Sequence, residues 1–79
     1  MQEFWIRLGS VKDVQDFVDN AATRPYPVVV RDSHNKISAD SFMELFCLDF
    51  TQPLRVVANC SYEQVQDLIR DLDRLVVRD

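Results

Sequence analysis

The chain has 79 residues, 47% of them hydrophobic and 28% charged, and this balance is typical of a globular domain rather than a disordered segment. Its formal net charge of −4 disfavours a nucleic-acid binder that depends on a broad basic field. A single glycine disfavours a glycine-rich phosphate loop. We therefore expect residues 1–79 to form a single domain that binds no nucleic acid.

Cysteine usage and the N-terminal stretch predict a cytoplasmic protein. Cys47 and Cys60 lack the C-x-x-C spacing, so both are expected to be reduced thiols packed as hydrophobes. Glu3 and Arg7 interrupt the N-terminal apolar stretch, which is therefore expected to be neither a signal peptide nor a membrane span. His34 is the only histidine and is expected to be a solvated turn residue. We expect no metal and no cofactor.

A strand and a helix are expected at the start of the chain. Residues 2–8 alternate apolar and polar side chains, which predicts a half-buried strand. Helical spacing follows over residues 11–23, and Ser10 is the expected N-cap of that helix. Its apolar stripe consists of Val11, Val14, Phe17, Val18 and Ala21.

A hairpin and a short helix are expected next. The β-branched run 28–30 predicts a second strand, and residues 36–38 predict a third. Asn35 is expected to adopt the left-handed conformation in the turn between them. The short helix is expected to run from about Asp40 or Ser41 to Leu48.

The remaining segment predicts a strand and the clearest helix of the chain. A fourth strand is expected over residues 54–59, and Ser61 with Gln64 is the signature of a capping box. The apolar stripe of the last helix is Val65, Leu68, Ile69, Leu72, Leu75 and Val76. The complete order, βαββαβα, predicts an α+β fold in which a four-stranded antiparallel sheet carries three helices on one face.

This order resembles HPr, the small phosphocarrier of the bacterial sugar phosphotransferase system, over nearly the whole chain. The best local match, Ile37 to Leu45, looks like the family stretch V-N-L-K-S-I-M-G-V, which opens the second helix. The resemblance implies an HPr-like open-faced β-sandwich from a bacterium. It also places Ser41 at the family's regulatory serine, which a dedicated kinase phosphorylates in many Gram-positive bacteria.

The resemblance also identifies a departure at the phosphoryl acceptor. Where the family has G-I-H-A-R-P, this chain has residues 8–13, L-G-S-V-K-D, so Ser10 stands at the position of the histidine and Lys12 at that of the arginine. Phosphohistidine is a phosphoramidate that passes its phosphate on, whereas phosphoserine is a stable ester. We therefore expect Ser10 to be a plain N-cap, no phosphohistidine relay and no enzymatic activity.

Two surfaces are expected to bind protein partners. In HPr the equivalent of Lys12, Met43 and Phe46 docks enzyme I, sugar-specific enzymes, the kinase and a transcription regulator. The resemblance thus implies a non-catalytic regulatory module whose partner is a kinase or a transcription regulator of carbon metabolism. The second surface is the outer face of the sheet, and its candidate residues are Trp5, Arg7, Arg31 and Arg55.

Two other classes of function are compatible with the sequence. An ACT-type small-molecule sensor has a related βαββαβ order, but its ligand loop after the first strand is often glycine-rich, and here Gly9 stands alone. A structural module would self-associate through the Trp5 face. The chain is expected to be a monomer or a weak homodimer, without membrane insertion.

Overall fold

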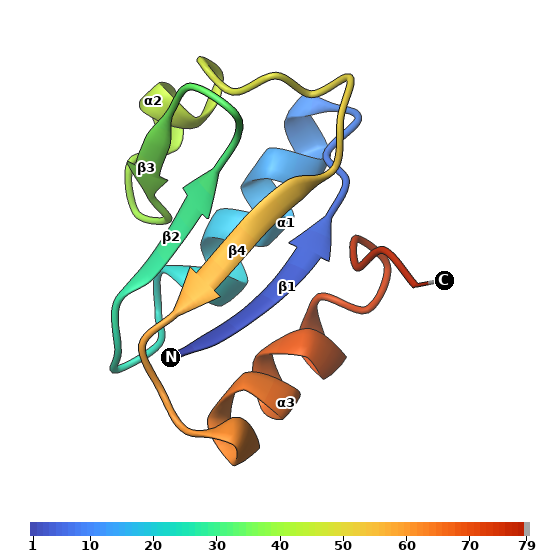
Figure 1. Cartoon of the computed structure of the whole chain (residues 1–79). Coiled ribbons are helices and arrows are strands. Elements are labelled where there is room, and N and C mark those ends of the chain that lie inside the picture. The colour runs from blue at the N-terminus through green and yellow to red at the C-terminus, as the bar shows by residue number, and fades with distance from the viewer. Residues whose placement is uncertain (79) are drawn as a thin grey trace.

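The computed structural model describes residues 1–78 and contains the expected elements in the expected order. The elements are β1 (Gln2–Ile6), α1 (Val11–Ala21), β2 (Val28–Arg31), β3 (Lys36–Ser38), α2 (Phe42–Leu45), β4 (Leu54–Ala58) and α3 (Tyr62–Asp71). The four strands form one antiparallel sheet in the order β1-β4-β2-β3, and the helices cover one of its faces (Figure 1). The predicted α+β class and four-stranded sheet are confirmed.

The two faces of the sheet differ in burial. The register places Ile6 of β1 opposite Leu54 of β4, and both of these inward side chains are fully buried. The outward neighbour Trp5 is 47% exposed. Strands β1 and β2 run parallel with β4 between them, so α1 connects two strands that are not neighbours. The three helices leave the outer face open to solvent.

The hydrophobic core fills the space between the inner face of the sheet and the helices. Phe17 of α1, Leu45 of α2 and Leu68 of α3 each have no exposed surface. Val11 was expected in the apolar stripe of α1, but it is 64% exposed, because it lies in the first turn beyond the edge of the core. Within residues 1–78, no polar or charged residue is buried, so the helices and the sheet meet through apolar contacts.

Both predicted helix caps are confirmed. The Ser10 hydroxyl accepts a hydrogen bond from the backbone N–H of Asp13 at 3.2 Å. At the start of α3, the Gln64 N–H donates to Ser61 Oγ at 3.1 Å, and the Ser61 N–H donates to Gln64 Oε1 at 3.0 Å. These bonds satisfy N–H groups that have no partner inside the helix.

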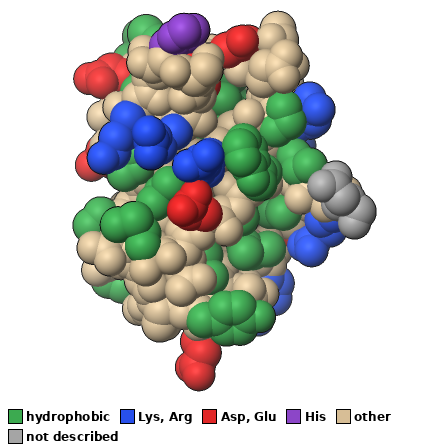
Figure 2. Space-filling model, viewed as in Figure 1, with side chains coloured by type: hydrophobic (Ala, Val, Ile, Leu, Met, Phe, Trp, Pro, Cys, Tyr) green, Lys and Arg blue, Asp and Glu red, His purple; other side chains and the backbone are tan. Residues whose placement is uncertain are grey.

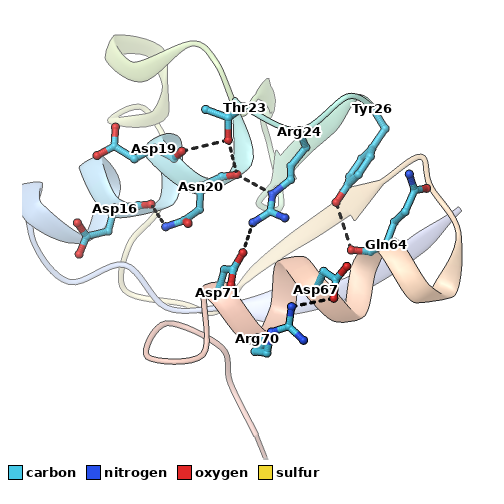
Figure 3. Close-up of polar contacts among 10 residues, drawn as sticks. All are labelled: Asp16, Asp19, Asn20, Thr23, Arg24, Tyr26, Gln64, Asp67, Arg70 and Asp71. Carbon is cyan, nitrogen blue, oxygen red and sulfur yellow. Dashed lines mark hydrogen bonds and ion pairs between the residues drawn. The ribbon is translucent and has the colours of Figure 1, made fainter.

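Arg24 connects the end of α1 to α3, as Figure 3 shows. Its Nε donates to the carbonyl oxygen of Asn20 at 2.9 Å, and its Nη2 donates to Asp71 Oδ2 at 2.6 Å. Beside it, the Tyr26 hydroxyl donates to the carbonyl oxygen of Gln64 at 3.4 Å. The cation therefore meets the negative end of the α1 dipole and a carboxylate of the neighbouring helix.

The turn of the β2–β3 hairpin differs from the prediction. Within residues 1–78 no residue other than glycine has a positive φ, so the left-handed conformation expected for Asn35 is wrong. Instead, Asp32 Oδ1 accepts hydrogen bonds from the N–H groups of His34 at 2.7 Å and Asn35 at 2.6 Å. A side chain that bonds the backbone two and three residues on shapes the turn without that conformation.

The two later helices are shorter than predicted. α2 ends at Leu45, and the next residues form tighter turns in which the Leu48 N–H donates to the Leu45 carbonyl oxygen at 3.1 Å. α3 ends at Asp71. Leu75 is still buried, but Val76 forms an isolated antiparallel bridge with Ile6. This segment therefore covers the outer edge of β1 instead of extending α3.

No helix within residues 1–78 has the length and apolar character that crossing a membrane requires.

Candidate functional site

The N-terminus of α1 is the first candidate site, because the resemblance places the phosphoryl acceptor there. Ser10 has the extended conformation of an N-cap, with φ −157° and ψ 167°. Its hydroxyl oxygen is already used to accept the N–H of Asp13. The expectation that Ser10 caps the helix is confirmed.

Asp13 holds a negative charge at this helix terminus. Its Oδ2 accepts a hydrogen bond from the Gly9 N–H at 2.8 Å, and its Oδ1 accepts one from Arg74 Nη1 at 2.6 Å. The carboxylate side chain is only 17% exposed. The hydrogen bond from Arg74, followed by that from Gly9, holds the pKa of Asp13 below its ordinary value.

Arg74 joins this site from the distant end of the chain. It follows α3, and its second amino group, Nη2, donates to Asp16 Oδ2 at 2.6 Å. One guanidinium thus bridges two carboxylates of α1, and both hydrogen bonds raise the pKa of Arg74. Arg74 could not be identified from the sequence, since nothing local to it indicates a partner 61 residues away.

This arrangement decides what the helix terminus can do chemically. A helix N-terminus favours an anion, and here Asp13, a carboxylate of the same chain, supplies it. A phosphoryl group on Ser10 would meet that carboxylate, so like-charge repulsion opposes it. His34 lies in the β2–β3 turn as expected, with its backbone N–H bonded to Asp32. The imidazole is therefore placed on a different segment from the Ser10 cap.

An exposed apolar patch on α2 is the second candidate site. Met43 is 77% exposed and Phe46 is 38% exposed, whereas Leu45 is fully buried. Edge-to-face contacts connect Phe46 to Phe42 at 5.2 Å and to Phe50 at 6.1 Å between ring centroids. These contacts hold the Phe46 ring in place, and both Met43 and Phe46 remain accessible to a partner.

The resemblance assigns a docking role to Lys12 and regulatory phosphorylation to Ser41. Lys12 is exposed on α1, where its ammonium lies 3.7 Å from Asp16 Oδ1 on the same helix. Ser41 precedes α2 but makes no side-chain capping bond, and its hydroxyl donates only a weak 3.5 Å hydrogen bond to Asp40 Oδ1. Ser41 therefore occupies the N-cap position of α2 without a side-chain capping bond.

The outer face of the sheet is the third candidate site. The guanidinium carbon of Arg55 lies 5.4 Å from the centroid of the Trp5 ring, and Arg55 Nε lies 3.4 Å from Glu3 Oε1. Arg31 is directly opposite Arg55 on the neighbouring strand. The structure thus brings Trp5, Arg31 and Arg55 together, while Arg7 follows the end of β1.

The cysteines and acidic residues form no metal centre within residues 1–78. Cys47 is exposed, so the expectation that it packs as a hydrophobe is wrong, because it falls in the turn after α2. Cys60 is half-buried against the core, as expected, and burial raises the pKa of its thiol. A raised pKa disfavours the reactive thiolate.

Taken together, these features define a small α+β domain with an open sheet face and an apolar patch on a short helix. No model of a known protein family matches the chain, and no curated protein matches its sequence.

Proposed function

We propose that the chain is a divergent member of the HPr family that binds a protein partner in the bacterial cytoplasm and has no phosphocarrier activity. The order βαββαβα and a four-stranded antiparallel sheet with helices on one face are what this membership requires, and both support it. The stretch from Ile37 to Leu45 adds the local resemblance.

The main support for the proposed loss of phosphotransfer is that the Asp13 carboxylate occupies the N-terminus of α1. The Asp13 carboxylate accepts a hydrogen bond from the Gly9 N–H, and the Arg74 guanidinium neutralises its charge. A relay requires a histidine at the acceptor position, whereas Ser10 stands there and is committed to the cap. The proposed role is therefore regulatory and not catalytic.

The apolar patch on α2 supports the binding role. An exposed methionine beside an ordered aromatic ring is typical of an interface core, since both bury a large apolar area at low cost. Met43 and Phe46 would form that core. The resemblance assigns Lys12 to the same surface and makes Ser41 the candidate for regulatory phosphorylation. By the resemblance, the partner is a kinase or a transcription regulator of carbon metabolism.

A phosphotransfer assay tests the proposed loss of activity. The chain is incubated with phosphoenolpyruvate and enzyme I, and an authentic HPr in the same mixture verifies that enzyme I is active. We expect label on HPr and none on this chain. Turnover-dependent label on His34 or on any other residue of the chain would overturn the proposal.

A second assay tests the binding role. A serine kinase that modifies HPr is offered this chain and its Met43→Lys variant, with Lys36→Met as a control that changes an exposed residue of β3. We expect binding to the chain and to the control, and loss of binding for Met43→Lys. Equal binding by all of these proteins, or by none, would contradict the role proposed for the patch.

A further inference from the structure

A row of side chains crosses the open face of the sheet, with one residue from each strand. The register places Trp5 of β1 opposite Arg55 of β4, Arg55 opposite Arg31 of β2, and Arg31 opposite Lys36 of β3. Directly opposite residues of antiparallel strands project from the same face. Figure 2 views this face and shows Lys and Arg side chains gathered side by side across it.

This row concentrates positive charge in a chain whose net charge is −4. Like charges directly opposite each other on neighbouring strands are destabilising, so the pair Arg31 and Arg55 has an energetic cost. Glu3 lies beside Arg55 and offsets part of that cost. Within residues 1–78, neither Arg31 nor Lys36 forms an ion pair at 4 Å or less, so the row has positive charge that the described chain does not neutralise.

A groove of about 350 Å³ lies at this row. It is lined by Trp5, Arg31 and Arg55 from the sheet and by Ser33 and Gln52 from the flanking loops. Two acidic residues, Asp32 and Asp49, line the groove as well. Their carboxylates are held in the loops, because Asp32 accepts the backbone N–H groups of His34 and Asn35, and Asp49 accepts the backbone N–H and the hydroxyl of Thr51.

The size and chemistry of the groove fit a small molecule. Sites for small ligands generally occupy about 300–1,000 Å³ and combine an apolar wall with a few placed polar groups. The Trp5 ring supplies an apolar wall, Ser33 and Gln52 supply hydrogen-bonding groups, and the two guanidiniums supply charge. Met43 of α2 and Phe46 at its C-cap, the exposed apolar side chains of the other candidate surface, do not line this groove.

We propose that this groove binds a phosphate monoester of a small cyclic compound, such as a nucleoside monophosphate or a sugar phosphate, with the phosphate between Arg31 and Arg55. A phosphate dianion relieves the repulsion of two guanidiniums, and their planar donor geometry matches phosphate oxygens. The ring of the ligand lies toward Ser33 and Gln52. This proposal is independent of the proposed regulatory function.

Arg55 is positioned before the ligand arrives. Its guanidinium lies over the Trp5 ring and beside Glu3, so it loses little side-chain freedom on binding. Glu3 competes with the phosphate for the same cation. Trp5 is the only tryptophan of the chain, and its fluorescence therefore reports directly on this contact.

The test measures binding of four defined probes to the intact chain. Adenosine monophosphate, glucose 6-phosphate, inorganic phosphate and uncharged adenosine are titrated, and Trp5 fluorescence and backbone amide resonances are followed. We expect a saturable response to at least one phosphate ester, with amide shifts at Arg31, Ser33 and Gln52. Adenosine should bind at least tenfold more weakly, and the comparison of the two esters identifies the ring.

Variants with matched charge changes locate the site. Arg31→Gln and Arg55→Gln should each weaken binding roughly tenfold or more, since each removes a charge-assisted hydrogen bond to phosphate. Arg70→Gln changes the net charge equally on exposed α3 and should leave affinity unchanged. Glu3→Gln should tighten binding, because it removes the competing carboxylate. Circular dichroism verifies that each variant is folded.

Several outcomes would overturn the proposal. These are the absence of a saturable response at millimolar concentrations, equal affinity for inorganic phosphate and both esters, and equal loss of binding in Arg70→Gln. Tighter, Arg31-dependent binding of a hexaglutamate peptide than of any phosphate would assign the row to an acidic polypeptide instead. The phosphotransfer assay has no bearing on these results, so either proposal can fail alone.

Discussion

Arg74 donates a 2.6 Å hydrogen bond to Asp13, and this contact joins the turn after α3 to the first turn of α1. It occupies the helix terminus at which the family resemblance would place a phosphoryl group. The contact therefore connects the segment after α3 with the N-terminus of α1. It also makes the account testable through residues that take no part in the hydrophobic core.

The first prediction concerns the core. Phe17→Ala should lower the free energy of unfolding by about 3–5 kcal/mol, because the removed ring is fully buried and leaves a cavity. The exposed Val11→Ala should change it by less than about 0.5 kcal/mol. Urea denaturation measures both values. Equal effects of the two changes would contradict the packing described for α1.

The second prediction concerns the helix caps. Ser61→Ala and Ser10→Ala should each cost about 1 kcal/mol of unfolding free energy, because each leaves a helix N–H without its side-chain acceptor. Ser41→Ala should have a smaller effect, since the Ser41 hydroxyl makes no capping bond. Thermal unfolding followed by circular dichroism gives the comparison. A larger loss for Ser41→Ala than for Ser61→Ala would contradict the cap assignments.

The third prediction concerns acid stability. Hydrogen bonds from the backbone N–H groups of His34 and Asp49 lower the pKa of Asp32 from 3.8 to about 2. Since the folded pKa lies below the unfolded one, the folded state binds fewer protons in this interval. The stability from Asp32 is therefore complete above the unfolded pKa and is lost as pH falls toward 2.

A variant separates this contribution from general acid unfolding. Asp32→Asn should lower the melting temperature at pH 7, and the difference from the parent chain should shrink as pH falls toward 2. Thermal melts over this range test both points. A difference that stays constant with pH would show that the charge of Asp32 has no part in holding the loop.

The fourth prediction separates the α2 patch from the core beneath it. Met43→Lys should leave the free energy of unfolding within about 0.5 kcal/mol of the parent, because this side chain is exposed. Leu45→Ala should cost about 2–5 kcal/mol, since Leu45 is fully buried two residues further on. Urea denaturation decides. A comparable cost for both would show that Met43 packs in the core.

Features that depend on neighbours in the chain could be predicted from the sequence. The capping bonds of Ser10 and Ser61 involve residues three positions away, and spacing alone indicates them. The same holds for α2, where helical periodicity places Leu45 inside and Met43 outside. The order of the elements followed from changes in hydrophobic period, which are likewise local.

Features that depend on distant segments could not be predicted. Leu75 and Val76 continue the helical spacing, so the sequence predicts a longer α3 than the structure has. In the structure, Leu75 is buried beyond the helix end and Val76 forms a bridge with Ile6. Strand alternation predicted that Arg31 and Arg55 share the outer face, but only the register sets them directly opposite. Arg74 and Asp13 are far apart in the sequence, and only the fold brings them into contact.

The central claim is that Asp13, a carboxylate of the same chain, occupies the terminus of α1. The most direct measurement follows the Asp13 carboxyl carbon and the Gly9 amide by NMR as pH is lowered. We expect both to titrate together at a pKa below the ordinary aspartate value, and we expect Arg74→Gln to raise this pKa. An Asp13 pKa at or above the ordinary value, with a Gly9 amide that does not follow it, would contradict the account.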